Sequence, residues 1–389
     1  MYDPVKSRRS LSSSMQCGWK VFVLMGLSAL SPTMLADVVA ETQRHSVSNI
    51  PTLVANPESR DVSLRSELDV GIIVSSEVPI QSGTKAEASF RKTEAQLLAG
   101  KQRLVFDESG RWGVVRLFPE HSVIPQLMLD LVVRQSDGRE LLIEASLTAV
   151  NGDVLLNQIY LDRSGMDRFE GTEPIPHVGR ASDSEGPFAD LFHRIHTDAA
   201  RVVFESARSK TYLGTISFLR YAQQLVPTAF SGYLNSRDGE WTLLREPSEK
   251  DPMYARVAKL RDYELLFVDT IDEQLGATLR DIDVAYTLWL TASKEQLDWL
   301  ERRRARGLQV ESFTDDSAFA RHQAVYAAYR SLKIHEQELF ELVLDLESES
   351  RSTALNVENT VVKLEGTLEQ QYREWRETLL KIIQLENTF

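Results

Sequence analysis

The sequence predicts an α+β fold: a small α/β domain with a mostly antiparallel sheet, then a predominantly helical domain, then a C-terminal β-hairpin plus helix. Residues 67–160 alternate apolar runs with Gly-containing turns, which is typical of strands joined by hairpins. Residues 187–350 instead repeat apolar positions at a mean spacing of about 3.6, as amphipathic helices do. The length of 389 residues and the apolar content of 42% are sufficient for two or three compact domains.

The α/β domain at residues 67–160 opens with a strand, a helix and a second strand, and three more strands follow. Asp137-Gly138 and Asn151-Gly152 mark hairpin turns between them, because glycine and its Asp or Asn neighbour adopt positive φ at little cost. We expect strands at 68–75, 112–119, 127–134, 141–149 and 154–160, and the helix at 86–106.

A linker rich in Gly and Pro at residues 161–186 separates this part from the helical domain at 187–350. Asp251 and Pro252 suit the N-cap and first position of a long helix. The Ser-Lys-Glu-Gln run at 293–296 has the form of a capping box and predicts that another helix starts there. The predicted helices are 187–207, 211–229, the one from 252, 293–307 and 317–346.

Residues 351–389 are expected to form a hairpin and a docked helix. Asn359 and Thr360 lie between two apolar runs, and Thr367 with Gln370 forms a second capping box. The helix that follows carries an apolar stripe, and a helix of this length is only marginally stable alone in water. We therefore expect the stripe to pack on the rest of the protein.

The first 36 residues have the order of a secretory signal peptide. Basic residues up to Lys20 precede an uncharged stretch of 16 residues that ends in small side chains at Ala36. This stretch is short for a spanning helix, so we expect cleavage, with an uncleaved N-terminal anchor as the alternative. The mature chain would begin with a lead-in segment at 37–66, contain no membrane span, and be periplasmic or otherwise exported.

Charge and composition exclude several classes of function. The net charge is −13, and removal of the first 36 residues, which carry +3, would make it −16. Such an acidic protein repels phosphate backbones, so no nucleic-acid partner is expected. The single cysteine, Cys17, lies within the signal segment, so the mature chain would have no disulfide and no thiol nucleophile. Phosphate-loop, dinucleotide and Gly-x-Ser-x-Gly motifs are absent from the mature sequence, and no cofactor is indicated.

Three pieces of the sequence, in order, carry a resemblance to a known type of domain. They are the strand at 68–75, the Ser-Gly-Arg-Trp-Gly-Val-Val run at 109–115, and the turns at 136–139 and 151–153 within the meander. Residues 68–160 resemble the periplasmic α/β domain of the TolB amino-terminal, curli-secretion-channel and penicillin-binding-protein-activator type. The chain differs from the channels in lacking a lipidation cysteine after the apolar run. The resemblance implies protein–protein contact or assembly in the envelope.

The helical region is similar to one seen in uncharacterised bacterial exported proteins that end in a comparable charged and aromatic segment, here at 366–375. This second resemblance implies no activity.

Two sets of polar residues are candidates for chemistry, each with a simpler reading. His193 and His196 share one helix face and could bind a metal, but without a Glu general base they also suit an exposed polar face. Carboxylates along the long helix could bind a cation or act as acid and base, or form a solvated acidic face. They are Asp269, Asp272, Glu273, Asp281 and Asp283.

The tryptophans near the C-terminus suggest an interaction surface. Trp375 lies between Arg373 and Arg376, and Trp299 also has charged neighbours. Aromatic side chains beside arginine are frequent in interface hot spots. The alternative is that Trp375 packs the last helix onto the protein.

These observations favour an exported cell-envelope protein that acts as a non-catalytic interaction or assembly factor with an envelope protein as partner. The alternative is a periplasmic hydrolase or metal-dependent enzyme with a site between the α/β and helical domains, where ligand clefts often form.

The targeting segment makes the first testable prediction. Protein isolated from the envelope fraction should begin near Asp37 or Glu41, because the small residues that suit cleavage end at Ala36 and Ala40. Amino-terminal sequencing measures this directly. A mature protein that still contains Trp19 would contradict cleavage.

Overall fold

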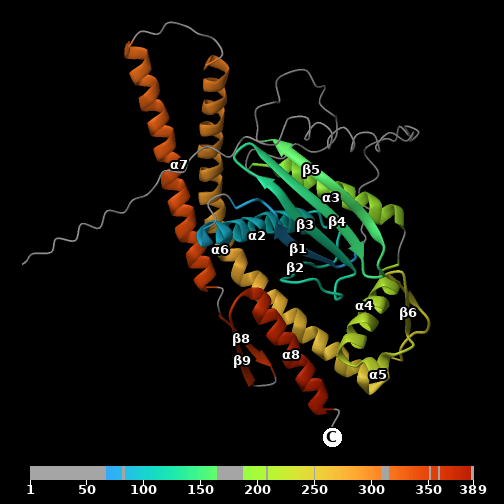
Figure 1. The fold of residues 1–389 in the computed structure, drawn as a ribbon. Coiled ribbons are helices and arrows are strands. Elements are labelled where there is room, and N and C mark those ends of the chain that lie inside the picture. Colours follow the sequence, from blue (N-terminus) through green and yellow to red (C-terminus); the bar gives the residue numbers. More distant parts are fainter. Residues whose placement is uncertain are drawn as a thin grey trace, which may run out of the picture. The chain divides into compact units, whose positions relative to one another are not determined.

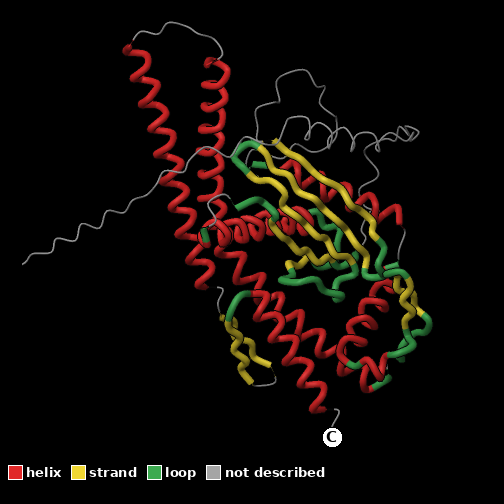
Figure 2. Tube along the Cα trace, in the orientation of Figure 1, coloured by secondary structure: helices red, strands yellow, loops and turns green. Residues whose placement is uncertain are grey.

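The structure is a computed structural model that describes residues 67–80, 84–163, 187–206, 209–248, 250–307, 315–349, 352–357 and 360–386. The α+β class is confirmed (Figures 1 and 2). The predicted signal segment at 1–36, the lead-in at 37–66 and nearly all of the linker at 161–186 lie outside the described residues.

The first part of the described chain forms a five-stranded sheet with strand order β2-β1-β3-β4-β5. β1 is parallel to both of its neighbours, whereas β3, β4 and β5 form the expected antiparallel meander (Figure 1). The elements are β1 (Val70–Ser76), α2 (Lys85–Glu108), β2 (Val115–Leu117), β3 (Leu127–Ser136), β4 (Glu140–Ala149) and β5 (Val154–Arg163).

One face of this sheet carries the core. Alternate residues of β4 from Leu141 to Ala149 are buried, and the residues between them are only partly covered. This period of two places one set of side chains against the helices. The helices that pack here are α2 and α3 (Ala189–Ser206), which contact β1 and β5 respectively and also each other.

A second hairpin follows between two of the predicted helices, at residues 230–251, for which the sequence analysis assigned no element. After α4 (Lys210–Leu225) and α5 (Pro227–Phe230), strands β6 (Leu234–Arg237) and β7 (Glu240–Leu243) pair in antiparallel register. Asp238 and Gly239 turn the chain with φ of 53° and 89°, as a type I′ turn requires. This hairpin was not predicted, because four-residue strands show little alternation, although the Asp-Gly pair was a usable signal.

The long helix α6 (Pro252–Gly307) is continuous, so the predicted helix start at 293–296 is wrong. A serine inside a helix costs well under 1 kcal/mol, which packing easily outweighs. The β3–β4 turn lies directly against this stretch: a Cβ on Gly138 would come within 2.4 Å of the Lys294 backbone nitrogen. Helix α7 (Asp315–Glu349) then packs along α6.

The C-terminal segment forms the expected hairpin, β8 (Ser352–Val357) and β9 (Thr360–Glu365), and helix α8 (Leu368–Glu386). The capping box is reciprocal: the Thr367 amide donates to Gln370 Oε1 at 2.9 Å, and the Gln370 amide donates to Thr367 Oγ1 at 3.3 Å. The apolar stripe of α8 packs on α6, and Tyr372, Trp375 and Leu379 are fully buried.

The buried apolar side chains of the sheet, of α6 and of α8 belong to one cluster, which crosses the division between the predicted domains. Within the described ranges, no helix combines the length and apolar character needed to cross a membrane.

Replacement of Trp375 tests the docking of α8. Trp375→Ala should lower the free energy of unfolding by about 3–5 kcal/mol, because it empties a buried site and removes the bond of 3.2 Å from Nε1 to the Tyr263 carbonyl. Urea unfolding followed by circular dichroism measures this, and Trp299→Ala, at a partly exposed site on α6, should cost less. Wild-type stability of the Trp375→Ala protein would show that the helix is not held in this way.

Candidate functional site

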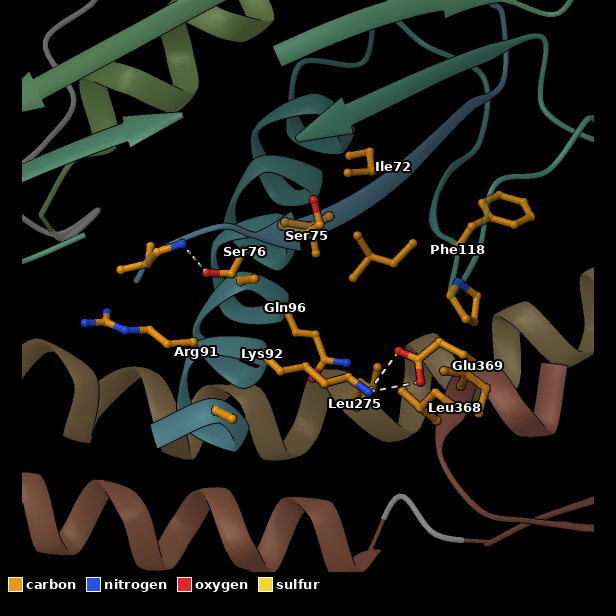
Figure 3. Close-up of a pocket in the computed structure, with 18 of the residues that line it drawn as sticks. Ile72, Ser75, Ser76, Arg91, Lys92, Gln96, Phe118, Leu275, Leu368 and Glu369 are labelled. Atoms are coloured by element: carbon orange, nitrogen blue, oxygen red, sulfur yellow. Dashed lines mark hydrogen bonds and ion pairs between the residues drawn. The ribbon is translucent and has the colours of Figure 1, made fainter. Parts of the chain in front are cut away.

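A pocket of about 280 Å³ opens at the carboxyl end of β1, where α2, α6 and the start of α8 meet (Figure 3). Ligands of open α/β sheets commonly bind outside the carboxyl ends of parallel strands, and β1 has a parallel strand on each side. The walls are mainly apolar and come from elements far apart in the sequence. They include Ile72, Val74, Phe118, Ile271, Leu275 and Leu368.

Small side chains on α2 account for the hollow. Ala88, Ala95 and Ala99 line the pocket, and their spacing of seven and four residues keeps them on one face of the helix. Larger residues at these positions would reach toward β1 and fill the space.

One ion pair lies at the edge of this pocket. Lys92 Nζ of α2 is 2.9 Å from the carboxylate of Glu369, in the first turn of α8, on the side opposite Ile72 and Phe118 (Figure 3). The Lys92 side chain is 49% exposed and that of Glu369 28%. Burial alone would raise the pKa of Glu369, but hydrogen bonds, led by that from Lys92, hold it below its usual range. The carboxylate is therefore ionised. Arg91 also lines the pocket, but its guanidinium is paired with Glu94, so Lys92 and Glu369 supply the charges at this edge.

A fully buried carboxylate lies on the same helix, next to the pocket. Glu94 accepts hydrogen bonds from Arg91 at 2.7 Å, from Ser136 at 2.6 Å and from Tyr286 at 2.9 Å. Burial and the nearby Glu94 raise the pKa of Tyr286 well above its usual value. This network ties α2 to the end of β3 and to α6, and the three hydrogen bonds to the Glu94 carboxylate suit a structural role.

A second hollow of about 570 Å³, between α2, β2 and α6, collects the acidic residues of the long helix. Three aspartates of α6 form ion pairs with cations of α2 and β2. Asp269 pairs with Arg116 at 2.6 Å and Asp272 with Arg103 at 3.1 Å. Asp283 pairs with Lys101 at 2.6 Å. Glu273 also lines the hollow, whereas the side chain of Asp281 lies outside the described part of the structure. The predicted acidic face is thus solvated at Asp269 and Glu273, and Asp272 makes a charged contact of α6 with α2.

Asp272 is the most buried of these carboxylates. Burial raises its pKa to about 6, although Arg103 and the amide of Leu117 act in the opposite direction. A carboxyl group with this pKa can exchange a proton near neutral pH, which is the property required of a general acid.

Of the two histidines, His196 belongs to the core. His196 is buried, with its ring centroid 5.1 Å from that of Phe106 and 6.1 Å from that of Trp112. Burial lowers the pKa of His196 to about 4, so the ring is neutral at physiological pH. The reading as an exposed polar face is wrong for this residue, because His196 is a packed core side chain. Among the described residues, no group of three His, Cys, Asp or Glu side chains could hold a metal ion.

The predicted interaction residues differ in their exposure. The Trp375 ring is buried and near Phe267, at 6.4 Å between centroids. Arg373 remains exposed and pairs with Glu120 at 2.9 Å, and Arg376 donates to Gln224 at 2.7 Å. Trp299 is half-buried near the far end of α6. The structure therefore leaves the arginines, not the Trp375 ring, at the surface of α8.

The pocket itself was not recognised from the sequence. Lys92 and Glu369 are separated by 277 residues, and nothing in the sequence pairs them. The recurrence of alanine on the inner face of α2 was the available signal, but alanine is also the best helix former.

Asp272 predicts a pH-dependent stability. Its folded-state pKa of about 6 lies above the unfolded value of 3.8, so its favourable contribution is complete below about pH 4 and is lost as the pH rises through about 6. The difference in unfolding free energy between wild type and Asp272→Asn should therefore change by roughly 2–3 kcal/mol, at the expense of wild type, as the pH rises from about 4 to above 6. Urea unfolding at several pH values measures this. Asp269→Asn, which breaks a more exposed ion pair of the same hollow, controls for ion-pair loss. A difference that is constant with pH would contradict the prediction.

Comparison with protein-family models, with curated proteins and with solved structures found no match to this chain.

Proposed function

We propose that the protein is an exported, non-catalytic interaction or assembly factor of the cell envelope. The surface through which it contacts an envelope protein is formed by the exposed apolar side chains of its own helices α6 and α7. The signal-like segment at residues 1–36 supports export, and the resemblance of residues 68–160 to envelope domains supports an assembly role.

The observation that carries this proposal is a set of large apolar side chains left in solvent on two long helices. On α6, Val284 is 65% exposed and Leu288 is 45% exposed, one helical turn further on. On α7, Tyr326 and Ile334 are more than half exposed. Apolar residues at a spacing of four on a helix surface are the anchors of helix-in-groove recognition.

These residues are not part of the inward stripe of α6. That stripe uses Ile282 and Tyr286, which are buried, whereas Val284 and Leu288 project from a different side of the helix. Each side chain would contribute roughly 1.5–3 kcal/mol if a partner buried it completely. The acidic charge of the chain disfavours anionic lipid and nucleic acid as that partner.

A hydrolase with a site between the sheet and the helices is the second candidate, and the hollow around Asp272 is the observation that favours it. The raised pKa of Asp272 suits a general acid. However, Asp269, Asp272 and Asp283 are each paired with a cation, which suits a structural role for these carboxylates. We therefore favour binding over catalysis.

Site-specific cross-linking tests the binding proposal. A photoreactive residue at Val284 or Leu288 should cross-link to a specific envelope protein in cells, and one at Glu205, an exposed polar position on α3, should not. The Val284→Lys, Leu288→Lys double variant should lose the complex while retaining its melting temperature, because both side chains are exposed. A complex that survives this variant would place the contact elsewhere, and cross-links between copies of this chain alone would indicate self-assembly.

A further inference from the structure

We propose that the pocket between β1, α2 and α8 binds a free hydrophobic α-amino acid, with the apolar side chain inside and the zwitterionic head at the Lys92–Glu369 pair. This inference is independent of the proposed contact surface on α6 and α7, because the two regions share no residue.

The interior of the pocket selects an apolar group. Ile72 and Phe118 face Leu275 and Leu368 across it, and the alanines of α2 supply the remaining wall (Figure 3). A volume of about 280 Å³ is at the small end of ligand sites, suited to one aliphatic or aromatic side chain and not to a cofactor. Such a ligand would gain most of its affinity from the apolar surface removed from water.

The edge of the pocket selects the head group. Lys92 and Glu369 present opposite charges 2.9 Å apart, and a zwitterion carries the complementary pair on a single carbon atom. The ligand carboxylate can pair with the Lys92 ammonium while the ligand ammonium pairs with the Glu369 carboxylate. Every charge then keeps an opposite partner, so the exchange leaves no ion unpaired.

The same reasoning disfavours simpler ligands. The carboxylate of a fatty or aromatic acid would pair with Lys92 and would then lie beside the ionised carboxylate of Glu369. The ammonium group of a simple amine would pair with Glu369 and would then lie beside the ammonium group of Lys92. Both arrangements place like charges together, which costs binding free energy.

Further features permit the exchange and orient the head. Lys92 is half exposed, so its ammonium can swing outward without unfolding the helix. Gln96 lies next to the pair, and Ser75 and Ser76 line the pocket at the end of β1 (Figure 3). Their amide and hydroxyl groups can donate and accept hydrogen bonds to the ligand head.

Titration calorimetry on the full mature chain provides the test. L-phenylalanine and L-leucine should bind saturably, with Kd between roughly 1 µM and 1 mM for ligands of this size. N-acetyl-L-phenylalanine lacks the ammonium, L-phenylalaninamide lacks the carboxylate, and glycine lacks the side chain. Each should bind at least about tenfold more weakly, which corresponds to one lost charged or apolar contact.

Two variants locate the site. Lys92→Met removes the positive group, and Ala99→Leu fills the pocket; both should weaken phenylalanine binding at least about tenfold. Lys85→Met, an exposed lysine at the start of the same helix and outside the pocket, should bind as wild type does. Circular dichroism establishes that each variant is folded, and Lys92→Met, at an exposed position, decides the matter if Ala99→Leu is not folded.

Three results would overturn the proposal: no saturable heat with either amino acid, unchanged binding by Lys92→Met, or N-acetyl-L-phenylalanine binding as tightly as phenylalanine. The last result would mean an apolar acid site without zwitterion recognition. None of them affects the cross-linking test at Val284 and Leu288.

Discussion

The apolar stripe of α6 is the constraint on which the rest of the structure depends. Its buried residues recur from Val257 to Leu290, and an isolated helix cannot cover such a face. The chain supplies partners from every region: α2 and β2 from the sheet layer, α4 before the helix, and α7, β8 and α8 after it. Because all of these elements meet the same helix, the sheet and the helical part share one core and are not independent bodies.

Polar contacts then set the register of α6 against its neighbours. Two buried glutamates, Glu94 and Glu264, accept phenolic hydrogen bonds from another element, Tyr286 for the first and Tyr372 for the second. Burial raises the pKa of Glu264, which is why the Tyr372 hydroxyl and the nearby Arg376 matter. The aspartates of α6 add ion pairs to α2 and β2. An acidic helix can therefore pack on a sheet layer whose facing side chains are basic.

Local patterns in the sequence predicted most elements, because strand alternation, Asp-Gly turns and capping boxes act within a few residues. The Thr367–Gln370 box is the clearest case, and its bonds have the predicted form. The same pattern at 293–296 failed, because α6 continues through it, packed there against the Gly138 turn. The burial of His196 and the Lys92–Glu369 pair were equally beyond local reasoning, since both depend on segments distant in sequence.

The docking of α8 also has a consequence for biosynthesis. Tyr372 and Glu264 are 108 residues apart, so the part of α6 that α8 covers stays exposed until those further residues have been made. At a synthesis rate of about 5–20 residues per second, that interval lasts on the order of 5–20 seconds. During this interval Phe267 and the ionised Glu264 are exposed to water or to a bound chaperone. This part of α6 is therefore a site that a chaperone for apolar helical faces can bind until α8 has emerged, and products truncated before α8 would keep it exposed.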